Sequence, residues 1–414
     1  MLSTVNPCSN TCYLTGWRKI QITVMSATVA PVRLLAVTVT FVSWTAVSKI
    51  LEVLIDLKKA SREQKRRIWY PMSFLCRAML FCAGFHHIEV RGTRAPTGRA
   101  RILALAPHRG FFDALLFLAI GGDTLGVVAA AEHVNIPAIG LSLKLSDSIL
   151  VRRNDPASRK MTVAAIKSVF TSDETDSRQI CMFPEGTCHN NQSLMSFKPG
   201  AFIPGEPVQL ATVEFLNGWD TFSWTMEGPS AAVLFWYTLC QLQSRVRITF
   251  LPVYEPNGEE KIKPSLFARN VRTVFSTALK LPVTEHSMLD CKLMEHADKC
   301  GLPMSVGCVE MMKLRQMFGI ELSQAQVQEV LNNYAQIVQL SGDGDGKCGI
   351  TLEQFATHLR RPVTNAGLRE FFNLCDLNRS GRVDFRGYLI GCNSVFMSCE
   401  VSEKLGYIPF DSCE

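Results

Sequence analysis

Charged side chains are scarce in this sequence. Asp, Glu, Lys and Arg make up 19% of its 414 residues, whereas hydrophobic residues make up 47%. This balance is more apolar than that of a typical soluble protein, and it favours a segment or surface that contacts a membrane. The net charge of +6 is too small to indicate nucleic-acid binding. We therefore expect membrane lipids, and no nucleic acid, among the partners.

The sequence also lacks closely spaced cysteine pairs. It contains 15 cysteines, but none forms a C-x2-C pair, and the closest two are Cys8 and Cys12. This spacing argues against a zinc site and against a disulfide framework. Several cysteines, such as Cys76, Cys82 and Cys240, lie in apolar runs, where a free thiol behaves as a small hydrophobic side chain. We therefore expect a reducing compartment.

An unstrained membrane span needs about 20 consecutive apolar residues, and no apolar run in this sequence is that long. The stretch from Ile20 to Ile55 is broken by a proline and by charged residues, and the stretch from Trp69 to Phe85 contains Arg77. The interruptions favour helices that enter one leaflet, with a single true span as the alternative. A secretory signal is disfavoured because the apolar region continues well beyond a short signal core.

Basic residues gather between these two apolar stretches, at residues 58–67. A basic run beside apolar segments suits anionic lipid headgroups, each cation contributing about 1 kcal/mol near such a surface. A solvated helix face is the alternative. Residues 1–19 are polar, and we expect them to be disordered or loosely anchored. Residues 1–68 are therefore interpreted as an N-terminal tail and membrane-embedding helix with a basic linker.

From His87 onward, short apolar strands alternate with helical stretches. This alternation predicts an α/β domain whose functional residues lie at the ends of strands. Residues 218–241 are rich in Trp and Phe, and we interpret them as core rather than as an element that faces the membrane or an acyl chain. The predicted strands are Ile102–Ala106, Leu125–Ala129, Ile149–Val151, Ile180–Phe183 and Ile248–Tyr254.

Two short motifs carry the candidate chemistry. The first, at residues 106–113, supplies His108 and, five positions later, Asp113. A neutral imidazole can deprotonate a hydroxyl near physiological pH, and a carboxylate on its other ring nitrogen stabilises the charge that develops. Five residues correspond to about 140° around a helix, so we expect His108 in a loop and Asp113 in the first helical turn. The nucleophile motif G-x-S-x-G is absent, which favours direct attack by a hydroxyl.

The second motif, at residues 183–188, follows an apolar strand. Glu185 is unusual in a buried turn unless it meets a polar or cationic group, Gly186 lets the backbone approach a ligand, and Thr187 adds a hydroxyl. Such groups suit an acceptor that bears hydroxyls and a phosphate. Arg152 and Arg153 end an apolar run between the motifs, and guanidinium groups suit phosphate, although solvated surface arginines are the alternative.

Together the motifs resemble the lysophosphatidylcholine acyltransferase branch of the glycerolipid acyltransferase superfamily. Cys188 favours this branch, because phosphatidic-acid-forming relatives usually carry arginine at that position. The resemblance covers residues 69–303 and implies an α/β acyltransferase domain with a mixed sheet flanked by helices. The stretches that carry it are residues 106–113, 151–159, 183–188, 197–202, 250–256 and 270–272.

The resemblance also implies roles for individual residues. His108 and Asp113 would be the catalytic pair of an acyl-CoA-dependent enzyme. No tightly bound cofactor is implied, and acyl-CoA would be a co-substrate. The substrate-binding residues would be Arg153, Glu185, Gly186 and Thr187.

After residue 303 the composition changes to amphipathic helices with two acidic loops, which predicts a separate all-α domain at residues 304–414. The same branch often carries C-terminal EF-hands. In both loops the bidentate glutamate of position 12 is missing, because Gly387 and Gln354 stand there. We therefore expect a paired-loop structural domain without tight calcium binding. The candidate calcium ligands are Asp376, Asn378, Ser380 and Asp384 in one loop, and Asp343 and Asp345 in the other.

The predicted function is acyl transfer from acyl-CoA to the free hydroxyl of a lysophosphatidylcholine-like lysophospholipid, in phospholipid remodelling. Within the class, an acetyl-CoA-dependent ether-lysolipid acetyltransferase and a glycerol-3-phosphate or lysophosphatidate acyltransferase stay open. A catalytically silent, calcium-responsive membrane adaptor is the alternative from another class. The resemblance implies the endoplasmic reticulum membrane, with Golgi or lipid droplet as alternatives. A glycosylation pattern at Asn191, inside the proposed site, favours a catalytic domain that faces the cytosol.

Overall fold

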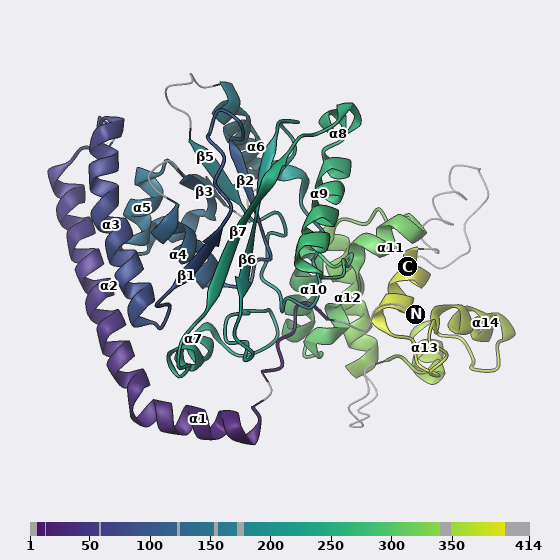
Figure 1. The fold of residues 1–414 in the computed structure, drawn as a ribbon. Coiled ribbons are helices and arrows are strands. Elements are labelled where there is room, and N and C mark those ends of the chain that lie inside the picture. Colours follow the sequence, from purple (N-terminus) through teal and green to yellow (C-terminus); the bar gives the residue numbers. More distant parts are fainter. Residues whose placement is uncertain are drawn as a thin grey trace. The chain divides into compact units, whose positions relative to one another are not determined.

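A seven-stranded sheet organises the larger part of the chain in the computed structural model (Figure 1). The strand order is β1-β7-β6-β2-β5-β3-β4. Strands β6 and β7 pair antiparallel, whereas all other neighbouring strands in this sheet pair parallel. The predicted mixed sheet is therefore confirmed. The strands are β1 (Ile88–Arg91), β2 (Ile102–Ala106), β3 (Leu125–Ala130), β4 (Ile149–Val151), β5 (Gln179–Met182), β6 (Val208–Phe215) and β7 (Val246–Tyr254).

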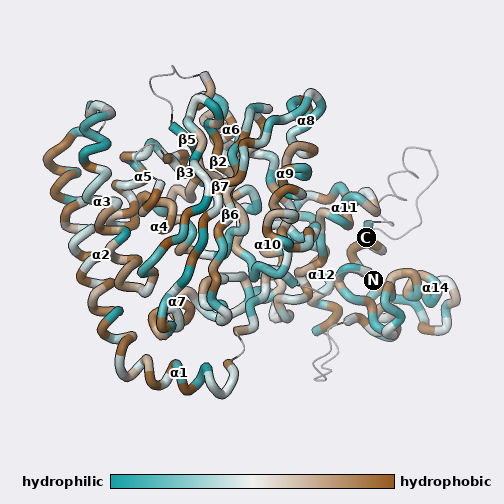
Figure 2. Tube along the Cα trace, viewed as in Figure 1, coloured by the Kyte–Doolittle hydropathy of each residue, from teal (hydrophilic) through white to brown (hydrophobic). Residues whose placement is uncertain are grey.

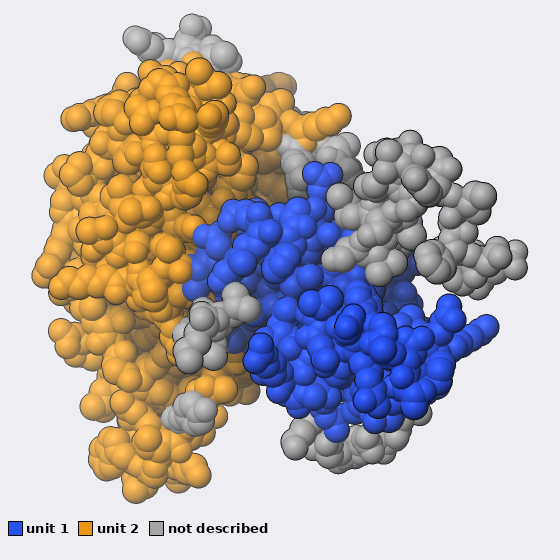
Figure 3. All heavy atoms as spheres, turned by 90° about the vertical axis from the view of Figure 1, so that its right-hand side faces the viewer, with its two compact units in different colours: residues 1–6, 284–414 blue, residues 7–283 orange. Residues whose placement is uncertain are grey.

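The structure describes residues 6–12, 14–57, 59–121, 125–152, 156–171, 178–339 and 349–393. The chain divides into two compact units, which Figure 3 colours separately. Residues 7–283 form the sheet unit, and residues 284–414 with residues 1–6 form the helical unit. The division lies between Val283 and Thr284. The domain boundary predicted from the sequence lies between residues 303 and 304.

Strand β2 is buried on both faces and leads directly into the first motif. Its five residues are all buried and alternate between two cores. Leu103 and Leu105 face the core formed with α3 (Arg62–Cys82) and α4 (Phe111–Ile120). A strand that is apolar on both faces can only sit in the middle of a covered sheet. The loop that follows β2 therefore begins from a fixed point.

Strands β1 and β6 were not predicted. The short edge strand β1 is half-exposed and carries charged residues, so its sequence lacks an apolar run. The sequence of β6 is interrupted by polar residues, including Gln209. The buried amide of Gln209 donates to Thr93 O at 2.9 Å and accepts from Ala95 N at 2.8 Å. These hydrogen bonds compensate the burial of a polar side chain within a strand.

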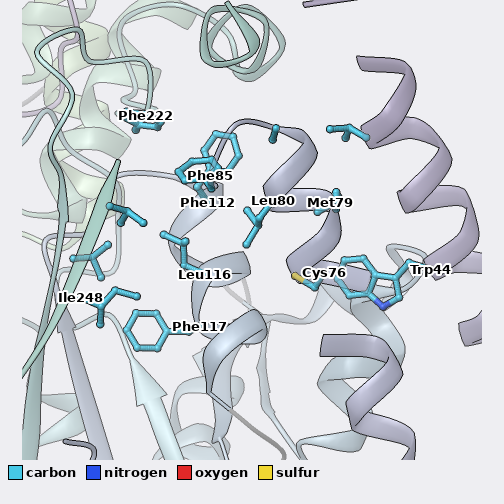
Figure 4. Packing of buried hydrophobic residues seen from close by; sticks show 14 of the residues in the cluster. Trp44, Cys76, Met79, Leu80, Phe85, Phe112, Leu116, Phe117, Phe222 and Ile248 are labelled. Carbon is cyan, nitrogen blue, oxygen red and sulfur yellow. The ribbon is translucent and has the colours of Figure 1, made fainter. Parts of the chain in front are cut away.

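Helices cover both faces of the sheet (Figure 1). On one face, Phe112, Leu116 and Phe117 of α4 pack with Phe85 and Ile248 (Figure 4). The opposite core includes residues of α6 (Pro156–Thr171) and α9 (Pro264–Leu279). In the segment predicted as core, Trp219 and Phe222 are buried, although Trp224 is half-exposed. The remaining helices of this part are η1 (Ala131–Asn135), α5 (Ile139–Leu145), η3 (Pro199–Ala201), α7 (Ala231–Leu239) and α8 (Gly258–Ile262).

The apolar N-terminal region forms α1 (Gly16–Ala27) and α2 (Val29–Leu54), and Figure 2 shows apolar residues along both helices. Among the described residues, α2 alone is long and apolar enough to cross a membrane, by length and composition. Only 17% of its apolar window is buried. Arg33, which interrupts the apolar run, donates to Leu239 O at 3.0 Å and to Leu242 O at 2.8 Å, so this charge anchors α2 at the end of α7.

Two expectations for the N-terminal region are corrected. Residues 7–12 are not disordered, because Cys8 is fully buried and backbone groups of this segment bond to distant loops. Part of the predicted basic linker is helical, because α3 begins at Arg62 with a Ser61–Gln64 capping box. Lys65 Nζ lies 3.0 Å from Asp147 Oδ1, so this cation pairs within the protein.

The helical unit has its own apolar core, which includes Leu331, Tyr334, Phe355, Phe372 and Phe385. A helix also covers residues 385–393. Ile350 and Val383 exchange two backbone hydrogen bonds, of 2.9 and 2.8 Å, and this bridge joins the ends of two loops. The other helices are α10 (Met288–Lys299), η4 (Met304–Gly307), α11 (Met311–Phe318), α12 (Gln324–Gln339), α13 (Leu352–His358) and α14 (Ala366–Cys375).

Candidate active site

The first motif forms a histidine–carboxylate pair at the end of β2. His108 Nδ1 donates to Asp113 Oδ2 at 2.9 Å. The same oxygen accepts from Arg109 N at 2.6 Å and from Gly110 N at 3.0 Å. His108 lies in the loop and Asp113 in the first turn of α4, the arrangement expected from their spacing. The three contacts and the start of α4 thus converge on one oxygen of the Asp113 carboxylate.

This arrangement fixes which nitrogen of His108 can act as a base. Because Nδ1 carries the proton donated to Asp113, the lone pair of the neutral ring lies on Nε2. The side chain keeps 21% of its surface exposed, whereas Asp113 is fully buried. The Phe183 ring stacks on the imidazole, with 4.0 Å between ring centroids and 24° between planes. The hydrogen bond to Asp113 and the stacked Phe183 ring therefore fix the orientation of the imidazole, and its exposed surface is accessible to a substrate.

The electrostatic surroundings make His108 more basic. Burial alone would lower the pKa of His108, but Cys188 and Asp113 together raise this pKa from 6.5 to about 10. Cys188 belongs to the second motif, so the two motifs meet at this imidazole. A higher pKa strengthens Nε2 as a proton acceptor, and it also keeps the ring protonated to higher pH.

Glu185 supports the backbone of the loop that carries His108. Its carboxylate is fully buried, and Oε2 accepts from the backbone N–H of His108 at 2.8 Å. Oε1 accepts from Met195 N at 3.2 Å and lies 2.8 Å from His189 Nε2. The sequence interpretation had Glu185 contact the acceptor. The structure instead engages both of its oxygens with protein groups, because the turn after β5 packs directly against the loop after β2.

The Gly186–Thr187 end of the turn is half-exposed, unlike the buried Glu185 before it. Gly186 has a φ of +69°, which favours glycine over other residues. A Cβ at this position would lie 2.5 Å from Lys198 Nζ, so the ammonium group lies directly over the turn. In the sequence, Lys198 is only one residue of the stretch 197–202 that carries the family resemblance. Its position adds a cation beside the predicted acceptor site.

Arg109 is a site residue that sequence reasoning missed. Its Nη2 lies 2.6 Å from Asp220 Oδ2, its Nε donates to Ser223 Oγ at 3.0 Å, and its guanidinium lies 5.3 Å from the Phe215 ring centroid. Burial would raise the pKa of Asp220, but Arg109 beside it holds this pKa below its ordinary value. Arg109 thus points into the protein and anchors the loop that carries His108. Because its partners are distant in sequence, only its place between His108 and Gly110 signalled a role.

Three predicted residues, Arg153, Asp343 and Asp345, lie outside the described part of the chain. In the other acidic loop, Asp376 accepts from Ser380 N at 3.0 Å and from Gly381 N at 2.7 Å. Asn378 also accepts from Ser380 N, and Asp384 accepts from Gly387 N. Across the described ranges, no three His, Cys, Asp or Glu side chains are grouped so that they could hold a metal ion.

Comparison with known proteins places this geometry in a class. A family model described as acyltransferase matches residues 87–204, which include both motifs. Lysophosphatidylcholine acyltransferase 2B of Rattus norvegicus is 38% identical over 408 residues, covering 98% of this chain and 77% of the relative. Lysophosphatidylcholine acyltransferase 1 of Homo sapiens is 36% identical over 398 residues, covering 94% and 72%.

The chain is therefore an acyltransferase, and it belongs to the lysophosphatidylcholine acyltransferase family. The crystal structure of the 1-acyl-sn-glycerophosphate acyltransferase PlsC from Thermotoga maritima covers 64% of the chain with a TM-score of 0.44 and 16% identity.

Proposed function

We propose that the protein transfers an acyl group from acyl-CoA to the free hydroxyl of a lysophosphatidylcholine-like lysophospholipid. The observation that carries this proposal is the 2.9 Å hydrogen bond between His108 Nδ1 and Asp113 Oδ2, with the accessible imidazole beside the Glu185–Cys188 turn. The names of the relatives support the acceptor class.

In the proposed reaction, His108 Nε2 takes the proton of the acceptor hydroxyl while the hydroxyl oxygen attacks the thioester carbonyl. Asp113 stabilises the imidazolium that forms. The tetrahedral intermediate then collapses and breaks the carbon–sulfur bond. The imidazolium returns its proton to the departing CoA thiolate, so the products are a phospholipid and CoA. No covalent acyl-enzyme is needed.

The acceptor would be held at the turn after β5. Gly186 and Thr187 would contact its glycerol and phosphate, and Lys198 Nζ above the turn would attract the phosphate. Arg153, which lies outside the described residues, remains a proposed second cation. Glu185 would support this site from below, through the His108 backbone, rather than touch the acceptor.

A membrane location agrees with the exposed surface of the N-terminal helices. We propose that these helices embed the enzyme in the endoplasmic reticulum membrane with the active site on the cytosolic side, where acyl-CoA and lysolipid meet. The exposed apolar side chains on α1, α2 and α3 include Trp17, Ile20, Val24, Val32, Leu35, Val39, Val42, Val53, Leu54, Tyr70, Phe74 and Phe81.

For the helical unit we propose an EF-hand-like pair of loops with a structural role. The bridge between Ile350 and Val383 supports paired loops. The carboxylate of Asp376 is engaged by backbone N–H groups of its own loop, and Gly387 supplies no carboxylate at the twelfth position. Calcium binding would therefore be weak.

The test is acyl transfer by membranes that carry the wild type or His108→Ala. Labelled acyl-CoA and acetyl-CoA are offered with lysophosphatidylcholine, ether lysolipid, lysophosphatidate and glycerol 3-phosphate, with and without calcium. A product that requires His108 supports the enzyme, and the preferred pair identifies donor and acceptor. Folded wild-type protein that gives no His108-dependent product with any pair would overturn the proposal and favour a silent adaptor.

A further inference from the structure

The N-terminal segment Pro7–Cys12, called the strap below, runs beside the loop that follows the second motif. Asn190 N donates to Pro7 O at 2.9 Å, and Asn190 Nδ2 donates to Ser9 O at 2.8 Å. Cys8 is fully buried. Two hydrogen bonds from one residue fix the strap against the loop at residues 189–191.

The strap also bonds to a second loop, at residues 219–227. Asn10 N donates to Glu227 O at 2.8 Å, and Glu227 N donates to Cys8 O at 3.0 Å. Asn10 Nδ2 donates to Ser223 O at 2.8 Å, and the Trp219 indole donates to Cys12 Sγ at 3.4 Å. The strap therefore joins two loops that are separate in the sequence.

These two loops hold the peptide groups of His108 and Arg109. From the first loop, His189 N donates to His108 O at 3.1 Å, and in the turn just before this loop Glu185 accepts from His108 N. From the second, Trp224 N donates to Arg109 O at 2.7 Å, and Asp220 pairs with the Arg109 guanidinium. The catalytic loop is thus fixed from both sides by loops that the strap fastens together.

We propose that the strap positions His108 for catalysis, with Asn10 and Asn190 as its positioning residues. The inference rests on the proposed acyl transfer and adds a determinant of its rate. Neither amide touches His108. Each holds a loop whose backbone bonds set where the imidazole lies relative to Asp113 and to the acceptor. Loss of either amide loosens one loop, and small displacements of a catalytic group lower the rate strongly.

Two variants remove one strap bond each without adding charge. Asn190→Ala removes the donor to Ser9 O, and Asn10→Ala removes the donor to Ser223 O. Each is expected to lower kcat by about 10- to 100-fold, because misplacement by roughly 1 Å can cost that much, while the KM for acyl-CoA stays unchanged. Amide hydrogen exchange at residues 108–110 is expected to accelerate in both variants.

Asn257→Ala is the matched control. Asn257 caps α8 in the same unit, where its Oδ1 accepts from Glu259 N and Glu260 N, and it contacts neither the strap nor its loops. Losing this cap costs about 0.5–2 kcal/mol of stability. The control is therefore expected to lose stability with unchanged kcat and unchanged exchange at residues 108–110.

The outcomes distinguish the positioning role of the strap from the proposed acyl transfer. Lower kcat at constant KM, with faster exchange at residues 108–110 in both strap variants, supports the inference. Wild-type kcat and wild-type exchange in folded Asn10→Ala and Asn190→Ala proteins would overturn it. If the wild type itself gives no His108-dependent product, the proposed function fails, and the exchange measurement still decides whether the strap fixes the loop.

Discussion

Two buried carboxylates, Asp113 in the sheet unit and Asp376 in the helical unit, use their oxygens differently. Asp113 Oδ2 binds one imidazole and two backbone N–H groups, so its charge acts on a titratable side chain. Both oxygens of Asp376 accept from backbone N–H groups of its own loop. A carboxylate bound to a base tunes that base, whereas one bound to its own backbone stabilises a turn.

Gly186 in the sheet unit and Gly387 in the helical unit also differ in what surrounds them. Beside Gly186 the nearest group is the flexible end of a lysine side chain, which a ligand can share. At Gly387 a Cβ would lie 1.9 Å from Cys375 O, a backbone atom. One loop is thus open toward a ligand, and the other is closed against its own helix end. The comparison predicts chemistry in the first loop and structure in the second.

The largest effect is expected for Asp113→Asn. An amide at this position no longer stabilises the imidazolium, so kcat should fall by about 10²- to 10⁴-fold, the range of general acid–base catalysis. The measurement is acyl transfer at saturating acyl-CoA, with circular dichroism to establish folding. Asp376→Asn is the matched control, and it should leave the rate unchanged. Equal losses in both variants would remove the distinction between the two carboxylates.

Glu185→Gln should produce the next largest effect. The amide NH2 would replace one oxygen and face the N–H of His108 or of Met195, which leaves a buried donor without an acceptor. Such an unsatisfied group costs about 1–3 kcal/mol, so the unfolding temperature should fall together with kcat. Glu259→Gln, at an exposed ion pair with Lys263, should change neither quantity. A Glu185→Gln enzyme with wild-type stability and kcat would contradict the proposed support of His108.

The pH dependence tests the coupling between the motifs. Because the pKa of His108 is raised to about 10, the neutral base forms as pH increases, and the rate should rise with pH above 6.5. Cys188→Ala removes one cause of the raised pKa, so the rising limb should move to lower pH while product still forms. Complete loss of product would contradict a role for Cys188 that is limited to the pKa of His108.

The same raised pKa has a consequence for stability. A histidine that binds its proton more tightly in the folded state stabilises that state fully below its unfolded pKa of 6.5. This stabilisation is lost as pH rises through about 10. The wild type should therefore lose more unfolding free energy than His108→Ala across this range, measured by chemical denaturation at several pH values.

The pairing of His108 with Asp113 was predictable because the residues that produce it lie close together in the sequence. A buried apolar strand, a loop and a helix start occur within residues 102–113, and the five-residue spacing alone requires the loop. The apolar strands β2, β3, β4, β5 and β7 were predictable for the same reason.

The supports of the pair were not predictable, because their partners are distant in sequence. Asn10 and Ser223 are 213 positions apart, and Asn190 and Ser9 are 181 positions apart. The strap is polar, and its bonds involve main-chain groups, which leave no pattern in the side chains. A glutamate in a buried turn is unusual, so the sequence indicates that Glu185 has a partner. That partner is the backbone N–H of His108, and because almost every residue has a backbone N–H, the sequence could not identify it.

The smallest effect on activity is expected for Gly387→Glu, which adds the carboxylate that an EF-hand loop needs at position 12. The comparison predicts that calcium affinity does not appear, because the new Cβ would collide with Cys375 O and displace the helix that starts after Asp384. Overpacking of this kind costs about 1–3 kcal/mol, so the helical unit should unfold at lower temperature, without recovery in calcium.

Gly381→Ala is the control, because a Cβ added there would meet no atom within 4 Å, although its φ of +76° still adds strain. Calcium-dependent stabilisation of Gly387→Glu, measured by thermal unfolding with calcium or magnesium, would mean that the loop lacks only one ligand and is not closed by its packing.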